Sequence, residues 1–169
     1  MNRKPLIAAL AVALAAAAPA ARAHGDEHDR TKMHSKPRAT LAEEHAFGRQ
    51  GDPAKATRTV TIGMGDAMRY DPAEIGVKQG ETVRFVLRNN GRIRHEMIIG
   101  TLAELKEHGE LMKKFPNMEH DEPYMAHVEP GGSGQIVWTF TKPGEFSYGC
   151  LMPGHFEAGM VGRIVVSKR

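Results

Sequence analysis

Phe146-Ser-Tyr-Gly-Cys150-Leu-Met-Pro-Gly-His155-Phe-Glu-Ala-Gly-Met160, followed by Val161-Gly-Arg-Ile-Val-Val166, is the segment around which this sequence is organised. It contains the only cysteine, a histidine and a methionine, spaced five residues apart. Thiolate, imidazole and thioether are ligands that suit copper, and a Cys-His-His set with a weak axial Met is typical of electron-transfer copper sites. The loop therefore predicts three metal ligands, with a second histidine to come from elsewhere.

The first 23 residues have the pattern of a secretory signal peptide. Asn2-Arg-Lys4 is basic, residues 6–18 are apolar and Ala-rich, and Ala21-Arg-Ala23 matches an A-x-A cleavage site. The apolar run is short for a bilayer span, which disfavours a retained anchor. We therefore predict cleavage after Ala23 and a periplasmic mature protein with no stable membrane span.

The export signal also accounts for the net charge of the chain. It contains three of the 23 basic residues and none of the 20 acidic residues, so the mature chain has 20 of each, against +3 for the whole chain. A balanced charge provides no basic surface for nucleic acid, which we exclude as a partner.

A lone cysteine is informative in an oxidising compartment. Cys150 cannot form an intramolecular disulfide, and an exposed free thiol would be open to oxidation. A buried, inert cysteine is the other interpretation. The neighbouring His155 and Met160 favour metal ligation.

Residues 24–57 lack a sustained apolar period and are predicted to form a flexible tail, with a short helix near residues 41–47. The tail contains His24, His28 and His34, and short His-rich tracts can bind metal. After signal cleavage His24 would present both an amine and an imidazole, a strong pair for Cu(II). A merely solvated polar tail explains these residues equally well.

The folded domain is predicted to span residues 58–169. Alternating apolar and polar residues and short β-branched runs predict strands at about residues 58–64, 75–77, 82–88, 92–99, 135–141, 145–149 and 161–167. Asn89-Asn-Gly91 is a hairpin signal. Short strands separated by Gly, Pro and Asn turns predict an all-β sandwich or barrel.

His95 is the candidate for the second nitrogen ligand. It falls on a predicted strand, and a β-sandwich can bring strands that are distant in sequence together at one end. A lone histidine on a strand is usually a satisfied or exposed imidazole. The Cys150–Met160 loop favours the interpretation of His95 as a ligand, because the loop supplies every other ligand of the expected set.

Residues 58–169 resemble a cupredoxin, a member of the blue-copper protein family. The resemblance rests on Tyr70-Asp-Pro-Ala-Glu-Ile-Gly-Val-Lys-Gln-Gly-Glu-Thr-Val-Arg-Phe, then His95, then Cys150-x4-His155-x4-Met160. It implies a Greek-key β-sandwich with one type 1 copper site at one end. The ligands that it implies are the Cys150 thiolate, the His95 and His155 imidazoles and the axial Met160 thioether.

One residue departs from the family pattern. Many cupredoxins have an asparagine after the first histidine ligand, where it helps to brace the copper loop, and this chain has Glu96. The resemblance therefore leaves open how the loop is braced here.

Residues 101–130 are predicted to be an insertion that begins with a helix from about residue 101 to 114. Its apolar residues are spaced as one helical face, formed by Leu102, Leu105, Leu111 and Met112. Beyond the helix, methionine and histidine recur together as Met118, His120, Met125 and His127. Thioether and imidazole groups favour Cu(I), and imidazole also accepts Cu(II), so an accessory copper site is predicted. A loop that packs its methionines on the sandwich and leaves its histidines in solvent explains them equally well.

Three functions are consistent with these features. The first is a copper-handling protein that binds, buffers or oxidises copper in the periplasm, favoured by the accessory residues and by the similarity of the whole chain to periplasmic copper-tolerance cupredoxins. The second is a small electron carrier. Its redox partner would dock near His155, beside Leu151, Met152 and Phe156, if the edge of the His155 ring reaches the surface. Ordinary packing explains these three apolar residues equally well. The third is an enzyme such as a multicopper oxidase, which uses several domains and His-x-His pairs that this sequence lacks. We predict copper handling, with electron transfer as the alternative and no enzymatic activity.

Overall fold

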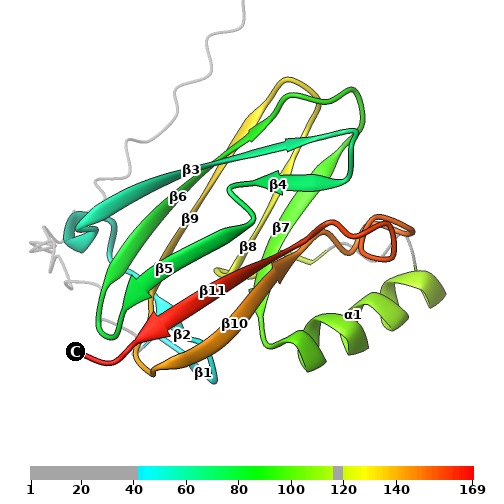
Figure 1. Ribbon diagram of the computed structural model, residues 1–169. Helices are drawn as coiled ribbons and strands as arrows, with labels where there is room; N and C mark the ends of the chain where they lie inside the picture. The colour runs from blue at the N-terminus through cyan, green and yellow to red at the C-terminus, as the bar shows by residue number, and fades with distance from the viewer. Residues whose placement is uncertain (1–41, 116–119) are drawn as a thin grey trace, which may run out of the picture. The chain divides into compact units, whose positions relative to one another are not determined.

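Alternating burial along the strands gives this protein two sheets that share one core. The computed structural model describes residues 42–115 and 120–169 (Figure 1). Val83, Phe85 and Leu87 of one strand are fully buried while Arg84 between them is not. Successive side chains of a strand point to opposite faces, so this pattern directs one face of the sheet inward.

The described residues form a six-stranded and a five-stranded sheet. The first has the order β1-β2-β9-β6-β3-β4, with β1 (Glu44–His45), β2 (Gly48–Gln50), β9 (Ser133–Thr139), β6 (Thr82–Asn89), β3 (Arg58–Gly65) and β4 (Arg69–Asp71). The second has the order β5-β11-β10-β7-β8, with β5 (Glu74–Lys78), β11 (Val161–Ser167), β10 (Gly144–Gly149), β7 (His95–Gly100) and β8 (Met125–Val128). β3 runs parallel to β6 and β5 parallel to β11, and the other pairs are antiparallel. The predicted all-β sandwich is confirmed.

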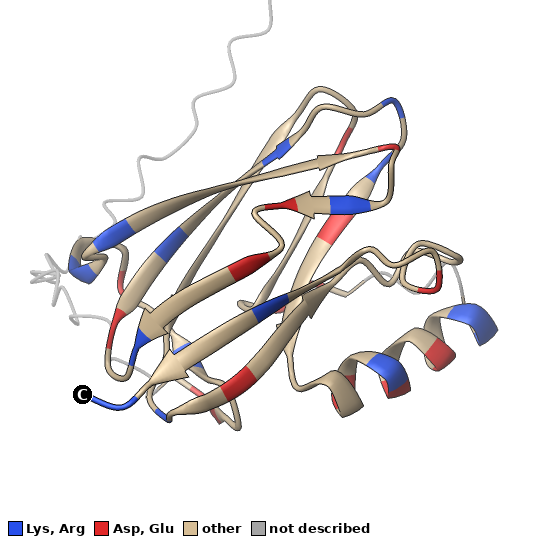
Figure 2. Ribbon diagram, in the orientation of Figure 1, with Lys and Arg blue, Asp and Glu red and all other residues tan. Residues whose placement is uncertain are grey.

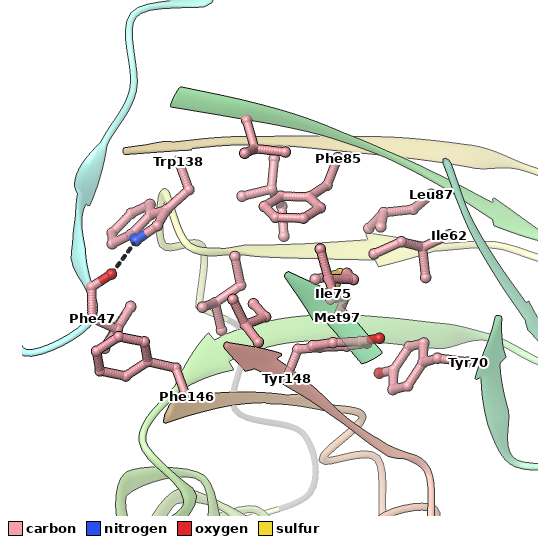
Figure 3. Packing of buried hydrophobic residues seen from close by; sticks show 14 of the residues in the cluster. Phe47, Ile62, Tyr70, Ile75, Phe85, Leu87, Met97, Trp138, Phe146 and Tyr148 are labelled. Atoms are coloured by element: carbon pink, nitrogen blue, oxygen red, sulfur yellow. Dashed lines mark hydrogen bonds between the residues drawn. The ribbon is translucent and has the colours of Figure 1, made fainter. Parts of the chain in front are cut away.

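The core between the sheets is built from aromatic and aliphatic side chains (Figure 3). Trp138 and Phe85 from the first sheet face Tyr148 and Met97 from the second, and all four are fully buried. The buried polar end of Trp138 is satisfied, because its Nε1 donates to the carbonyl of Phe47 at 2.9 Å.

The domain begins earlier than the sequence predicts. The boundary placed at residue 58, and the short helix expected near residues 41–47, are wrong: β1 and β2 form there, and β2 pairs with β9. Phe47 is 2% exposed and stacks on Trp138 with ring centroids 5.2 Å apart. This packing fixes the segment, although it has no apolar period of its own. Residues 1–41, with the predicted signal peptide, lie outside the described residues.

Asn89-Asn-Gly91 does not form the predicted hairpin. β6 belongs to the first sheet and β7 to the second, so the chain crosses between the sheets at this point. The buried Asn89 amide donates to the carbonyls of Ile93 and Val128 at 2.8 and 2.9 Å, and its oxygen accepts from the Gly91 N–H at 2.9 Å. The asparagine therefore stabilises a crossover between sheets.

The insertion contains the predicted helix and one strand that was not predicted. The N-cap of α1 (Leu102–Lys114) is Thr101, which forms a reciprocal capping box with Glu104. Its buried face is narrower than predicted, because Leu105 and Met112 are buried whereas Leu102 and Leu111 are 46% and 43% exposed. β8 then adds to the edge of the second sheet, opposite β7.

Charged residues are distributed over both sheets and along α1, with basic and acidic positions interspersed (Figure 2). Several of them pair on the surface, as Arg163 does with Glu74 and Lys113 with Glu157. Among the described residues, no helix combines the length and the apolar character that crossing a membrane requires.

Phe47→Ala should lower the free energy of unfolding by about 3–5 kcal/mol, because the substitution leaves a cavity against Trp138. Equilibrium urea denaturation measures the change. Arg49→Ala is the matched control, since that side chain lies two residues away and is 51% exposed, and it should change stability by less than about 0.5 kcal/mol. Equal losses in the two variants would show that residues 44–50 are not part of the core.

Candidate metal centre

The candidate site lies where the loop between β10 and β11 meets the start of β7. Cys150 follows the last residue of β10, and His95 is the first residue of β7. Because β7 and β10 pair antiparallel, with Ile98 opposite Gly149, the beginning of one strand lies beside the end of the other (Figure 1). The second sheet thus joins two segments that are distant in the sequence.

The structure brings three of the predicted ligands together. The donor atoms of His95, Cys150 and His155 all lie within 4.8 Å of one another. The Cys150 sulfur is 3.2 Å from Nδ1 of His155, and the two imidazole rings have centroids 5.0 Å apart. His95 and Cys150 are fully buried, and His155 is partly exposed.

The chemistry of these groups fits a metal ion. Both ring nitrogens of His95 are buried without a hydrogen-bond partner in the described part of the chain, which is costly for a polar group unless another partner satisfies it. Burial, and then the charge of Glu96, raise the pKa of the Cys150 thiol to about 12. A cation would satisfy the imidazole and stabilise the thiolate, and the thiolate-imidazole set suits copper.

The pKa values of the two candidate imidazole ligands support the same conclusion. Burial lowers the pKa of His95, with the neighbouring His155 contributing, and burial also lowers the pKa of His155. Both rings are therefore held neutral, which is the form that binds a metal.

Met160 is fully buried at the end of the same loop. The Cys150 N–H donates to its carbonyl at 3.1 Å, and its own N–H donates to the carbonyl of His155 at 3.0 Å. Arg69, which the sequence analysis missed, donates from Nη1 to the carbonyl of Ala158 at 2.7 Å. The loop is thus closed by its own backbone and held from outside by β4.

Glu96 braces the cysteine loop, which answers the question that its departure from the family pattern left open. Its Oε1 accepts a hydrogen bond from the backbone N–H of Leu151 at 2.6 Å. Glu96 is 2% exposed, and its backbone carbonyl accepts from the hydroxyl of Tyr70 at 2.6 Å. A glutamate therefore holds the residue after Cys150, where the family pattern has an asparagine.

The predicted accessory ligands have different positions. Met125 is buried in a small cluster with Ile98, Leu105, Met112 and Leu151, so it packs as a core residue. The rings of His120 and His127 have centroids 6.4 Å apart, and both residues line a surface hollow with Arg94 and Asp121. Met118, His24, His28 and His34 lie outside the described residues.

A third histidine joins this pair and was missed. The ring centroid of His108 on α1 lies 4.6 Å from that of His120. Burial lowers the pKa of His108, and the contact with Glu96 raises that of His127. The sequence contains a signal for His108, because it lies three residues after Leu105 and four before Met112, on the buried face of the helix. We call His108, His120 and His127 the histidine cluster.

The chain matches the family model described as copper binding proteins, plastocyanin/azurin family, over residues 56–167. It is 53% identical over 139 residues to the copper-resistant cuproprotein CopI of Rubrivivax gelatinosus, covering 82% of this chain and 84% of that protein. It is 36% identical to the protein of the same name from Pseudomonas aeruginosa, covering 76% of this chain and 86% of the other.

Solved structures agree on the fold. Reduced auracyanin from Roseiflexus castenholzii superposes with a TM-score of 0.58 at 24% identity, over 66% of this chain and 98% of that one. Auracyanin B gives a TM-score of 0.57 at 19% identity, over 75% and 98% of the two chains. These likenesses confirm the cupredoxin resemblance seen in the sequence.

In the metal-free protein, Cys150 should react with iodoacetamide more slowly than the unfolded chain does, on the order of tenfold or more. The thiol is fully buried and its pKa is raised to about 12, so few thiolates form at mildly alkaline pH. Mass spectrometry of native and denatured samples measures the two rates. Equal rates would show that the thiol is open to solvent.

Proposed function

This chain belongs to the plastocyanin/azurin family of copper-binding proteins, and on that premise we propose that it protects the cell by binding excess copper in the periplasm. In this proposal His95, Cys150, His155 and Met160 hold one type 1 copper ion. The histidine cluster provides a further binding place. The protein acts by binding the metal and not as an enzyme.

The observation that carries this proposal is the histidine cluster beside the buried site. His108, His120 and His127 come from α1, the segment after it and β8, and their rings approach within 4.6 and 6.4 Å. Imidazole is a good ligand for copper in either oxidation state. An electron carrier needs only its one buried site, whereas a protein that buffers a metal gains capacity from a second.

The names of the relatives support the same function. Two proteins that match most of the length of this chain, from Rubrivivax gelatinosus and Pseudomonas aeruginosa, are named copper-resistant cuproprotein CopI. The predicted signal peptide would direct this chain to the same task outside the cytoplasm.

The residues of the site would each contribute to holding the metal. Copper bound by a thiolate and two imidazoles can change its charge by one electron. The buried His95 and Cys150 exclude water, the lowered pKa values of both imidazoles keep their nitrogens available, and Glu96 fixes the loop through Leu151.

Electron transfer is the alternative function. It is favoured by His155, which is partly exposed while the other two donors are buried, so its ring offers a route to a docked redox protein. Of the apolar residues around it, Leu151 is buried in the core, and Met152 and Phe156 are partly exposed. Leu151 therefore serves packing, and only the other two could contact a partner.

Cys150→Ala should abolish the thiolate-to-copper charge-transfer absorption of the copper-loaded protein, because no other thiolate exists in the chain. Met160→Leu should retain both copper and colour and shift the reduction potential, since the axial thioether bond is weak. Absorption spectroscopy and redox titration measure these changes. Persistent colour in the Cys150→Ala protein would disprove the ligand assignment.

Deletion of the gene should reduce growth in excess copper, and the wild-type gene should restore it.

A variant with His108, His120 and His127 all changed to Gln should restore growth only in part and bind less copper per chain. Metal analysis of the purified full-length protein measures the latter. Met125 is left intact in this variant because it is a core residue. Unimpaired growth of the deletion strain would favour the electron carrier. A copper content of one ion per chain in both the wild-type protein and the variant would favour it as well.

A further inference from the structure

Glu96 is a buried carboxylate whose two oxygens face two different parts of the chain. Oε1 accepts the hydrogen bond from the Leu151 N–H at 2.6 Å. Oε2 lies 3.0 Å from Nδ1 of His127. Because the Glu96 side chain is only 2% exposed, solvent weakens neither contact as it would on the surface.

These contacts connect the histidine cluster with the loop that carries Cys150. Pairing of β7 with β8 places Glu96 directly opposite His127, and the two side chains form a close ion-pair contact. Leu151, in turn, is the residue after Cys150. The Glu96 carboxylate therefore contacts both the histidine cluster and the loop that carries Cys150.

The physical chemistry of a buried carboxylate makes its two contacts interdependent. A buried charge is costly unless polar groups surround it, so loss of the His127 ring would leave Oε2 poorly compensated. Both oxygens belong to one planar group. If that group turns to bring Oε2 to another polar partner, the hydrogen bond between Oε1 and Leu151 must change as well.

We propose that Glu96 is a positioning residue and that His127 acts through it on the loop that carries Cys150. The inference rests on the function proposed above, in which that loop holds copper. It adds that the histidine cluster sets the geometry of the buried site and does not only provide a second binding place. A histidine that merely lined the surface hollow would have no such effect.

The test compares His127→Gln, Glu96→Gln and the double variant in the full chain. His108→Gln is the matched control for the metal-free NMR measurement, because His108 belongs to the same cluster but its ring contact is with His120, and the Glu96 carboxylate acts on it only through charge. The first readout is the amide proton signal of Leu151 in the metal-free protein, measured by NMR. The second is the affinity of the Cys150 site for copper, followed by its thiolate-to-copper absorption during competition with a chelator of known affinity, so that copper bound by the histidine cluster does not contribute.

His127→Gln should move the Leu151 signal and weaken copper binding at the Cys150 site about tenfold, the scale expected for residues that support metal ligands. His108→Gln should leave the Leu151 signal in place. The double variant should match Glu96→Gln alone, because His127 acts through the carboxylate.

An unchanged Leu151 signal in His127→Gln would overturn this proposal, as would two effects that simply add in the double variant. If Glu96→Gln does not fold, the proposal is tested by the Leu151 signal in His127→Gln and His108→Gln alone. The NMR measurement needs no metal. A wild-type protein that bound no copper would therefore refute the proposed function and leave the test of Glu96 intact.

Discussion

The antiparallel pairing of β7 with β10 is the constraint that creates the candidate metal centre. His95 and Cys150 are far apart in the sequence, and only this pairing, with Ile98 opposite Gly149, places the start of one strand beside the end of the other. The pairing is stabilised by the core on which both strands pack, including the fully buried Met97 and Tyr148. The short loop to β11 then needs only local hydrogen bonds to place His155 and Met160.

Much of this arrangement could be predicted from local patterns. The alternation in β6 and the β-branched run of β11 predict their strands because each has one buried face, and β11 matches the expected bounds of residues 161–167. Cysteine, histidine and methionine in one loop predict a copper site because few other roles require all three. The position of His95 could be inferred only by combining that loop with the strand pattern.

The predictions from sequence that proved wrong concern residues whose structure is determined by long-range contacts. Phe47 belongs to the domain because it stacks on Trp138, a residue of a strand far along the chain, and no period within residues 44–50 reveals this. Asn89 looks like a hairpin residue, yet its amide bonds to Val128 and stabilises a crossover. In the insertion, the spacing of Leu105, His108 and Met112 indicates that His108 faces the protein, although a pattern of apolar residues does not include a histidine.

A carboxylate beside the cysteine loop changes the electrostatics of the site as well as its geometry. Burial raises the pKa of the Cys150 thiol most, and the charge of Glu96 raises it further, so both oppose a thiolate in the absence of a cation. A cation held by His95, Cys150 and His155 would take the place of the thiol proton and so remove this penalty. The same side chain that opposes the free thiolate also fixes the loop that carries it, because Oε1 of Glu96 accepts the Leu151 N–H. Glutamate at this position therefore acts on the cysteine through both charge and hydrogen bonding, whereas a neutral asparagine could act only through hydrogen bonding.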